Sequence, residues 1–172
     1  MALLKMDMLQ NLQFLLMLLT VIASGLSAGI YFTFSNFVIK GLAQRPAAQG
    51  IAAMQAINIA VINPGFMVIF FGTGLACIVL MIVLLFQPQY YANFYWLGGT
   101  LLYLIGTLGV TMFRNVPLNN ELAIAAPDSE EAGLLWEKYL IDWTFWNHVR
   151  TITGAIATAL LILSLCYQPL SF

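Results

Sequence analysis

Charged residues are scarce in this chain. They make up only 8% of its 172 residues, as six Lys and Arg against seven Asp and Glu, and no basic run is present. A protein that binds nucleic acid needs a concentrated positive surface to contact phosphates, so we predict no nucleic-acid partner. The scarcity also argues against a soluble domain, whose surface normally carries many more charges.

Cysteine and histidine are scarce as well. Cys77 and Cys166 each stand alone in an apolar stretch, so the chain lacks the CxxC pair that a redox disulfide uses. His148 is the single histidine and belongs to no metal-ligand spacing such as HExxH. Haem would have only this residue as an axial ligand. We therefore predict no metal site.

Apolar residues are abundant, at 62% of the chain, and the mean hydropathy is +0.91. One soluble core cannot bury so much apolar surface, so the chain is predicted to be an integral membrane protein of one domain, residues 1–172. A spanning helix needs about 20 apolar residues. Four stretches are of about this length or longer, namely residues 8–37, 66–86, 94–113 and 150–167.

The segments between these stretches also predict helices. Residues 47–62 have helical periodicity with polar Gln and Asn side chains, which indicates an interfacial helix before the second span. Pro64 marks a kink or a helix start, because proline lacks the backbone donor. Asp128 or Ser129 is predicted to cap the helix that leads into the fourth span. The predicted fold is an all-α, four-transmembrane-helix up-and-down bundle.

The second and third spans are joined by a short connection without formal charge. Residues 87–89 end the second span, and Tyr90, Tyr91, Tyr95 and Trp96 predict an aromatic belt at the membrane surface. A connection this short makes the two spans antiparallel neighbours.

Positive charge predicts the orientation. Five of the six Lys and Arg residues lie on the side of the first and third connections, and Lys5 alone lies on the side of the termini. Because positive loops remain in the cytoplasm, the first and third connections are predicted to be cytoplasmic, in an inner or plasma membrane.

Polar chemistry is concentrated in residues 114–122 and 136–150. These segments hold three of the six Lys and Arg residues, three of the four Trp residues and the only His. Spacings of three and four place several of these side chains on one stripe of the fourth helix: Trp136, Tyr139, Trp143, Asn147 and Arg150. The stripe is predicted to line a pocket, at one mouth of the bundle, for a flat apolar molecule with oxygen substituents.

Each feature also has a simpler interpretation. Trp143 and Trp146 are typical of a membrane-edge belt. Arg114 and Arg150 are typical of arginines that reach lipid headgroups or pair with nearby carboxylates. A lone His at an interface is more often a structural hydrogen-bonding residue than a base.

The chain resembles the anthrone oxygenase-like family of small membrane proteins in four motifs. These are SGLSAGIYFTFSNF at 24–37, MQAINIAVINPGF at 54–66, NVPLNNEL at 115–122 and WxxWNHVR at 143–150. Family members in polyketide pathways oxidise an anthrone to an anthraquinone with molecular oxygen and without a recognised metal or flavin. The resemblance implies a membrane oxidoreductase without a cofactor, although many members have no assigned reaction.

Such chemistry needs a base, an oxyanion stabiliser and a dry aromatic pocket. If the resemblance extends to activity, His148 is the base, because imidazole exchanges a proton near neutral pH. Arg150 and Arg114 then stabilise the oxyanion. The predicted substrate-binding residues are Asn115, Asn119, Trp143, Trp146, Asn147, Asn36 and Asn63.

A second class of function fits the same residues. The chain is then a non-catalytic membrane protein that binds a lipid, a quinone or a pigment, or a subunit of a larger membrane assembly. The predicted partners are a small hydrophobic aromatic substrate and the lipid bilayer, and self-association into a homo-oligomer is left open. Oxygen uptake in the presence of an anthrone separates the two classes.

Overall fold

The computed structural model describes residues 2–86 and 93–167 of the chain, and every regular element in these ranges is a helix. A helix satisfies its backbone hydrogen bonds internally, which an apolar chain in lipid requires. Seven α-helices and three π-helical segments (η) occur in these ranges: α1 Ala2–Thr33, η1 Phe34–Val38, α2 Ile39–Ala43, α3 Ala47–Ala60, α4 Pro64–Leu85, α5 Asn93–Leu101, η2 Leu102–Gly109, η3 Thr111–Asn115, α6 Val116–Ala123 and α7 Glu130–Tyr167.

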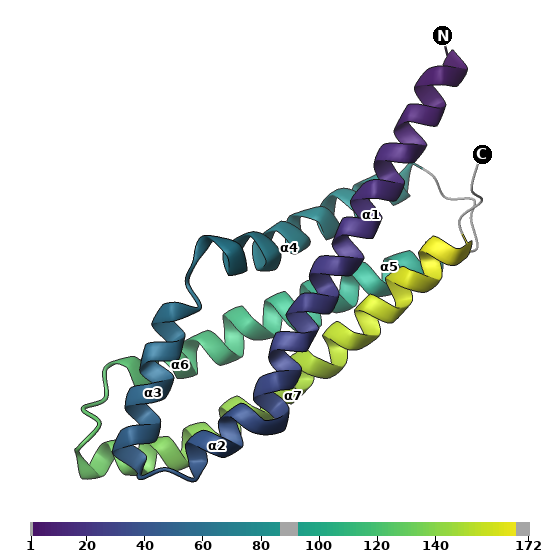
Figure 1. Cartoon of the computed structure of the whole chain (residues 1–172). Coiled ribbons are helices and arrows are strands. Elements are labelled where there is room, and N and C mark those ends of the chain that lie inside the picture. Colours follow the sequence, from purple (N-terminus) through teal and green to yellow (C-terminus); the bar gives the residue numbers. More distant parts are fainter. Residues whose placement is uncertain (1, 87–92, 168–172) are drawn as a thin grey trace.

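Four helical stretches are long and apolar enough to cross a membrane: Met8–Ala43, Pro64–Leu85, Phe94–Ala123 and Glu130–Tyr167. The predicted four-helix transmembrane bundle is therefore confirmed. The beginning of α1 and the end of α7 lie at one end of the bundle, and α2, α3 and the beginning of α7 lie at the other (Figure 1). The predicted turn at residues 87–89 and the predicted belt residues Tyr90 and Tyr91 lie outside the described residues.

Two helical stretches continue past the predicted span ends. The first runs through η1 and α2 to Ala43, and the third runs through Pro117 to Ala123. Pro117 does not end the third stretch, because it occupies the first turn of α6, where a missing N–H removes no necessary bond.

Helix α7 is a single helix of 38 residues. At 1.5 Å per residue it is about 57 Å long, well above the roughly 30 Å of a bilayer core. Its first part therefore extends beyond the hydrocarbon. Of the two predicted caps, the structure supports Ser129, whose Oγ accepts a 3.1 Å hydrogen bond from the backbone N–H of Ala132.

The chain bends sharply between α3 and α4, and we call this bend the elbow (Figure 1). The end of the bundle that holds α2, α3 and the beginning of α7 is called the wide end. Asn63 stabilises the bend. Its Oδ1 accepts a 3.1 Å hydrogen bond from the backbone N–H of Phe66, and its Nδ2 donates to the carbonyl of Ala60 at 3.0 Å. Pro64 follows as the first residue of α4, so the proline starts a helix and does not kink one.

Helix α7 is the central element and packs against α1, α5 and η2. Small residues allow this close approach. An ideal Cβ atom at Gly106 would lie 2.5 Å from Cβ of Thr153, and one at Gly154 would lie 3.2 Å from Cβ of Ala28. Backbones at this separation gain the van der Waals contacts that hold membrane helices together.

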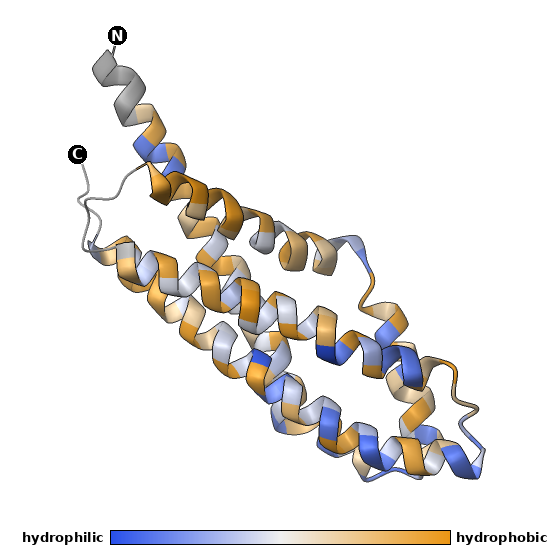
Figure 2. Ribbon diagram, turned by 180° about the vertical axis from the view of Figure 1, so that it is seen from behind, coloured by the Kyte–Doolittle hydropathy of each residue, from blue (hydrophilic) through white to orange (hydrophobic). Residues whose placement is uncertain are grey.

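The two ends of the bundle have different interiors. In the half of the bundle nearer the chain termini, Met17, Leu80 and Trp96 form a small apolar cluster. Trp96 is only 2% exposed, so it is a core residue and not the belt residue that its position predicted. Hydrophilic residues gather at the other end, along α2, α3, α6 and the beginning of α7 (Figure 2).

We predict that Gly106→Ala destabilises the protein by about 1–3 kcal/mol, because the added methyl group overlaps the stiff Thr153 side chain. The matched control is Gly29→Ala in α1, where a Cβ atom has no neighbour within 4 Å. This variant should match or exceed wild-type stability, since alanine is the better helix former by about 1 kcal/mol. Thermal unfolding in detergent compares the two. Equal melting temperatures would contradict the close contact between η2 and α7.

Candidate functional site

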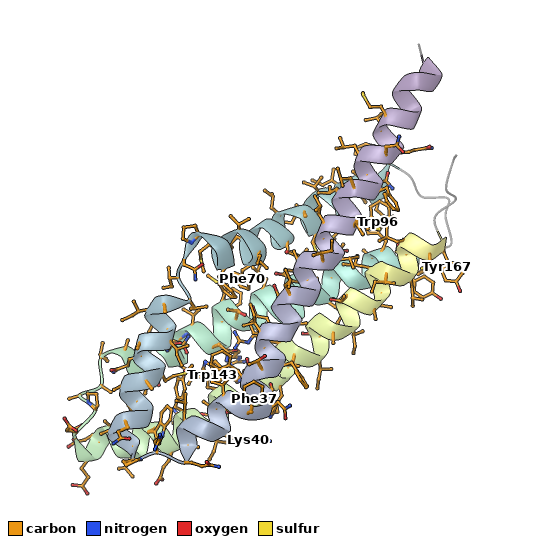
Figure 3. The ribbon with its side chains drawn as sticks, viewed as in Figure 1. Phe37, Lys40, Phe70, Trp96, Trp143 and Tyr167 are labelled. Carbon is orange, nitrogen blue, oxygen red and sulfur yellow. The ribbon has the colours of Figure 1, made fainter. Side chains whose placement is uncertain are left out.

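A cavity of about 490 Å³ lies at the wide end of the bundle, between the elbow, the third helical stretch and α7. Most of its lining is apolar. The lining residues are Ile30, Tyr31, Phe34, Met54, Gln55, Ile57, Asn58, Ile59, Val61, Ile62, Phe66, Met67, Phe70, Phe71, Thr111, Met112, Val116, Asn119, Asn120, Ala123, Trp143, Asn147 and Arg150. Phe70 on α4 and Trp143 on α7 are labelled in Figure 3. This lining includes one formal charge, the guanidinium of Arg150, and no carboxylate.

Arg150 is 5% exposed and all of its hydrogen-bond partners are neutral. Its Nη1 donates to Oγ1 of Thr111 at 3.2 Å, and its Nη2 donates to Oδ1 of Asn147 at 2.6 Å. Its Nε has no partner in the described structure. No described carboxylate pairs with this guanidinium, so its charge is held by neutral groups alone.

Two aromatic rings enclose the same guanidinium. Its central carbon lies 4.4 Å from the centroid of the Tyr31 ring and 5.3 Å from that of Trp143. Cations are attracted to the faces of such rings, most strongly where water is excluded. The arrangement keeps the charge at the cavity wall and covers it with flat apolar surfaces.

Asn147 fixes the orientation of Arg150. Its Nδ2 donates to the carbonyl of Tyr31 and to Oγ of Ser35, each at 2.8 Å, which leaves its Oδ1 to accept from Arg150. Ser35 Oγ also lies 3.0 Å from Oγ1 of Thr151. Because Ser35 belongs to η1, the π-helical turn of the first span is part of this network.

A second polar pair lies about two turns before Asn147 on α7. The Tyr139 hydroxyl donates to Oδ1 of Asn119 at 2.8 Å, and Asn119 lines the cavity. The rings of Trp136, Tyr139 and Trp143 stack in sequence, with centroids 5.6 and 5.8 Å apart. The predicted stripe on α7 is therefore buried as a whole, and Trp143, Asn147 and Arg150 from it line the cavity.

The structure brings together four of the predicted site residues at the cavity, namely Arg150, Asn147, Trp143 and Asn119. It places the others elsewhere. Asn36 and His148 are exposed and outside the lining, and Asn63 caps α4 at the elbow. Asn115 is buried behind the wall, where its Nδ2 donates to the carbonyl of Trp143 at 3.2 Å.

Arg114 and Trp146 form a pair of their own. Arg114 is exposed, and its guanidinium carbon lies 4.7 Å from the centroid of the Trp146 ring. Neither residue lines the cavity. His148 is outside the lining because it follows Asn147 by one residue. One residue along an α-helix is a rotation of about 100°, so the two side chains point in different directions.

Sequence reasoning did not identify Tyr31 and Thr111, which also line the cavity, as Asn58 does. Tyr31 precedes Ser35 by one helical turn, and Thr111 lies three residues before the polar segment that begins at Arg114. Nothing in the local sequence separates Thr111 from the other hydroxyl residues of the spans. Asn58 carried a signal, since an amide near membrane depth requires a partner.

The helices and the cavity define a class: a multi-pass helical membrane protein with a mostly apolar cavity whose lining contains a single buried cation. The family model for anthrone oxygenase matches residues 66–160, which are 95 of the 172 residues. The chain belongs to this family. The matched region includes Thr111, Trp143, Asn147 and Arg150, whereas Tyr31 and α3 precede it. Comparisons with curated proteins and with solved structures give no match.

We predict that Asn147→Leu lowers the free energy of unfolding by about 1–3 kcal/mol, because it leaves Nη2 of Arg150 without its acceptor and removes the donor to Oγ of Ser35. Asn36→Leu is the matched control, since Asn36 lies in the same π-helical turn as Ser35 but is exposed. An exposed substitution of this kind usually changes stability by less than about 0.5 kcal/mol. Similar melting temperatures for the two variants would show that the network does not hold Arg150.

Proposed function

We propose that this protein is a membrane-embedded oxidoreductase that oxidises a small hydrophobic phenolic or anthrone-type substrate with molecular oxygen. The observation that carries the proposal is the buried guanidinium of Arg150, which has no described carboxylate partner and lies in an aromatic cavity. Membership of the anthrone oxygenase family supports the same reaction. In this proposal Arg150 stabilises the negative charge that forms on the substrate. Trp143, Asn119 and the surrounding apolar side chains contact the substrate.

The proposed reaction converts the CH₂ group of the substrate to a carbonyl. Loss of one proton from this group gives an enolate, whose negative charge lies on the oxygen that faces Arg150. The enolate transfers electrons to molecular oxygen, and the product is a quinone with one molecule of water. One molecule of oxygen is consumed for each substrate oxidised, so the reaction needs no further reductant.

The cavity contributes to this reaction through electrostatics and the exclusion of water. A fixed donor aimed at developing negative charge is worth far more in an apolar site than in water. The faces of Tyr31, Trp143 and Phe70 provide flat apolar surfaces for a fused-ring substrate. The carbonyl of the substrate is thereby placed at the only formal charge of the lining.

We expect Arg150→Met to lower anthrone-dependent oxygen uptake by about 10²–10³-fold, the usual cost of removing an oxyanion donor. The assay uses purified protein in liposomes, with an oxygen electrode and the quinone absorbance as independent readings. Arg45→Met is the matched control, because Arg45 is exposed in the turn between α2 and α3. Arg150→Lys retains the charge and should retain part of the rate.

Two outcomes would contradict the proposal. The first is wild-type protein that takes up no oxygen with an anthrone, and the second is an Arg150→Met variant that folds and matches the wild-type rate. A wild-type protein that carries a tightly bound lipid, quinone or pigment and takes up no oxygen would favour the alternative, a non-catalytic binding protein or assembly subunit.

His148→Gln tests the predicted base separately. A general base contributes about 10²–10⁴-fold, so a catalytic His148 requires at least a tenfold loss of rate in this variant. We expect the variant to keep the wild-type rate, because His148 is exposed and outside the cavity lining. A tenfold loss with unchanged melting would establish the imidazole as the base.

The sidedness of the site remains a proposal based on charge. Five of the six Lys and Arg residues lie on the side of the first and third connections. We infer that the wide end of the bundle faces the cytoplasm.

A further inference from the structure

The charges around Arg150 do not balance in the described structure. Its direct partners are a hydroxyl group, on Thr111 of η3, and an amide, on Asn147 of its own helix. The ionisable groups that interact with it electrostatically are the phenols of Tyr31 on α1 and Tyr139 on α7. Phenols are neutral at pH 7. No Asp, Glu, Lys or His is among the residues that line the cavity.

A guanidinium enclosed in this way is costly unless an anion accompanies it. Buried charges in proteins are normally paired, and a charge that remains alone loses its hydration without compensation. The described carboxylates do not supply the pair. Glu121 and Glu131 line a different, shallower pocket, beside α6 and the beginning of α7.

The same lining offers no group that would accept a proton from a ligand near neutral pH. It contains amides, hydroxyls, one indole and one guanidinium, together with apolar side chains. Ile59, Ile62 and Met112 are lining residues and are also exposed, so the cavity opens to the outside near the elbow. A proton released by a ligand therefore has a route out of the cavity through this opening.

We propose that the cavity binds its ligand as an anion, with a phenolate or enolate oxygen as the counterion of Arg150 and without a side chain that acts as base. The ligand class is thus a fused-ring aromatic with an acidic hydroxyl or an enolisable carbonyl. The proton goes to bulk water when the ligand binds, so charge and atoms balance. The inference rests on the proposed function in one respect, the fused-ring aromatic structure of the ligand. The experiment below does not require the protein to oxidise anything.

Two effects on the ligand oppose each other in the cavity, and Arg150 decides which one is larger. Burial in an apolar site disfavours the anion and raises the pKa of a phenol. An opposite charge within about 4–6 Å favours the anion and lowers the pKa by about 1–3 units. The sign of the shift therefore reverses when the guanidinium is removed.

The test uses 2-hydroxyanthraquinone, a dye whose phenol and phenolate forms have different visible spectra. It has no CH₂ group, so it is not a substrate for the proposed oxidation. The dye is titrated with pH in the presence of purified protein in detergent, and empty micelles provide the reference. With wild-type protein we expect the midpoint of the anion spectrum to fall by at least one unit relative to the reference, at one dye per chain.

Variants separate the charge from the shape of the site. With Arg150→Met or Arg150→Gln the midpoint of the bound dye should rise above the reference, and with Arg150→Lys it should stay below it. Arg45→Met should behave as wild type, because Arg45 lies outside the cavity. Melting temperatures show which variants are folded. Two neutral variants are used, so the test can still be made if one of them does not fold.

The outcomes distinguish this inference from the proposed function. Wild-type protein that binds the dye with an unchanged or raised midpoint overturns the inference, even if it oxidises an anthrone. Wild-type protein that oxidises an anthrone but does not bind the dye overturns it as well. A lowered midpoint in a protein that takes up no oxygen supports an anion-binding cavity and contradicts the oxidoreductase.

Discussion

A positive charge enclosed between helices is the constraint on which the rest of this structure depends. Arg150 requires acceptors, and the protein supplies them from separate spans: Thr111 directly, and Tyr31 and Ser35 through Asn147. The first, third and fourth helical stretches are thus joined by polar groups at one level of the bundle. The second stretch is attached at another point, where the Tyr103 hydroxyl donates to the carbonyl of Phe70 at 3.0 Å.

The fold was largely predictable because its main determinant is the length of apolar sequence. Four stretches of spanning length predicted the four helices, and Pro64 marked the elbow. The helix ends were less predictable, since hydropathy locates the lipid boundary and not the end of the hydrogen-bond ladder. Pro117 shows the difference, because a proline in the first turn of α6 allows the third helical stretch to continue.

The candidate site was predictable only in part, because the sequence does not show how each helix is rotated about its axis relative to the others. Spacings of three and four correctly placed Tyr139, Trp143, Asn147 and Arg150 on one face of α7, since they depend on the period of a single helix. Which face of another helix meets that stripe depends on the packing of the whole bundle. Tyr31 shows this limit, because its contact with Arg150 joins residues far apart in the sequence. That these residues bind a substrate is a prediction.

The π-helical turns have a consequence for the length of the chain. Segments η2 and η3 together occupy most of residues 102–115, and a π-helical turn holds one more residue than the α-helical turn it replaces. Deletion of one residue there would restore ordinary α-helix and keep the segment equally apolar. It would also rotate every following side chain by about 100°, and Thr111 and Asn115 would no longer both face α7. This part of the wall is therefore more sensitive to the number of its residues than to the identity of most of them.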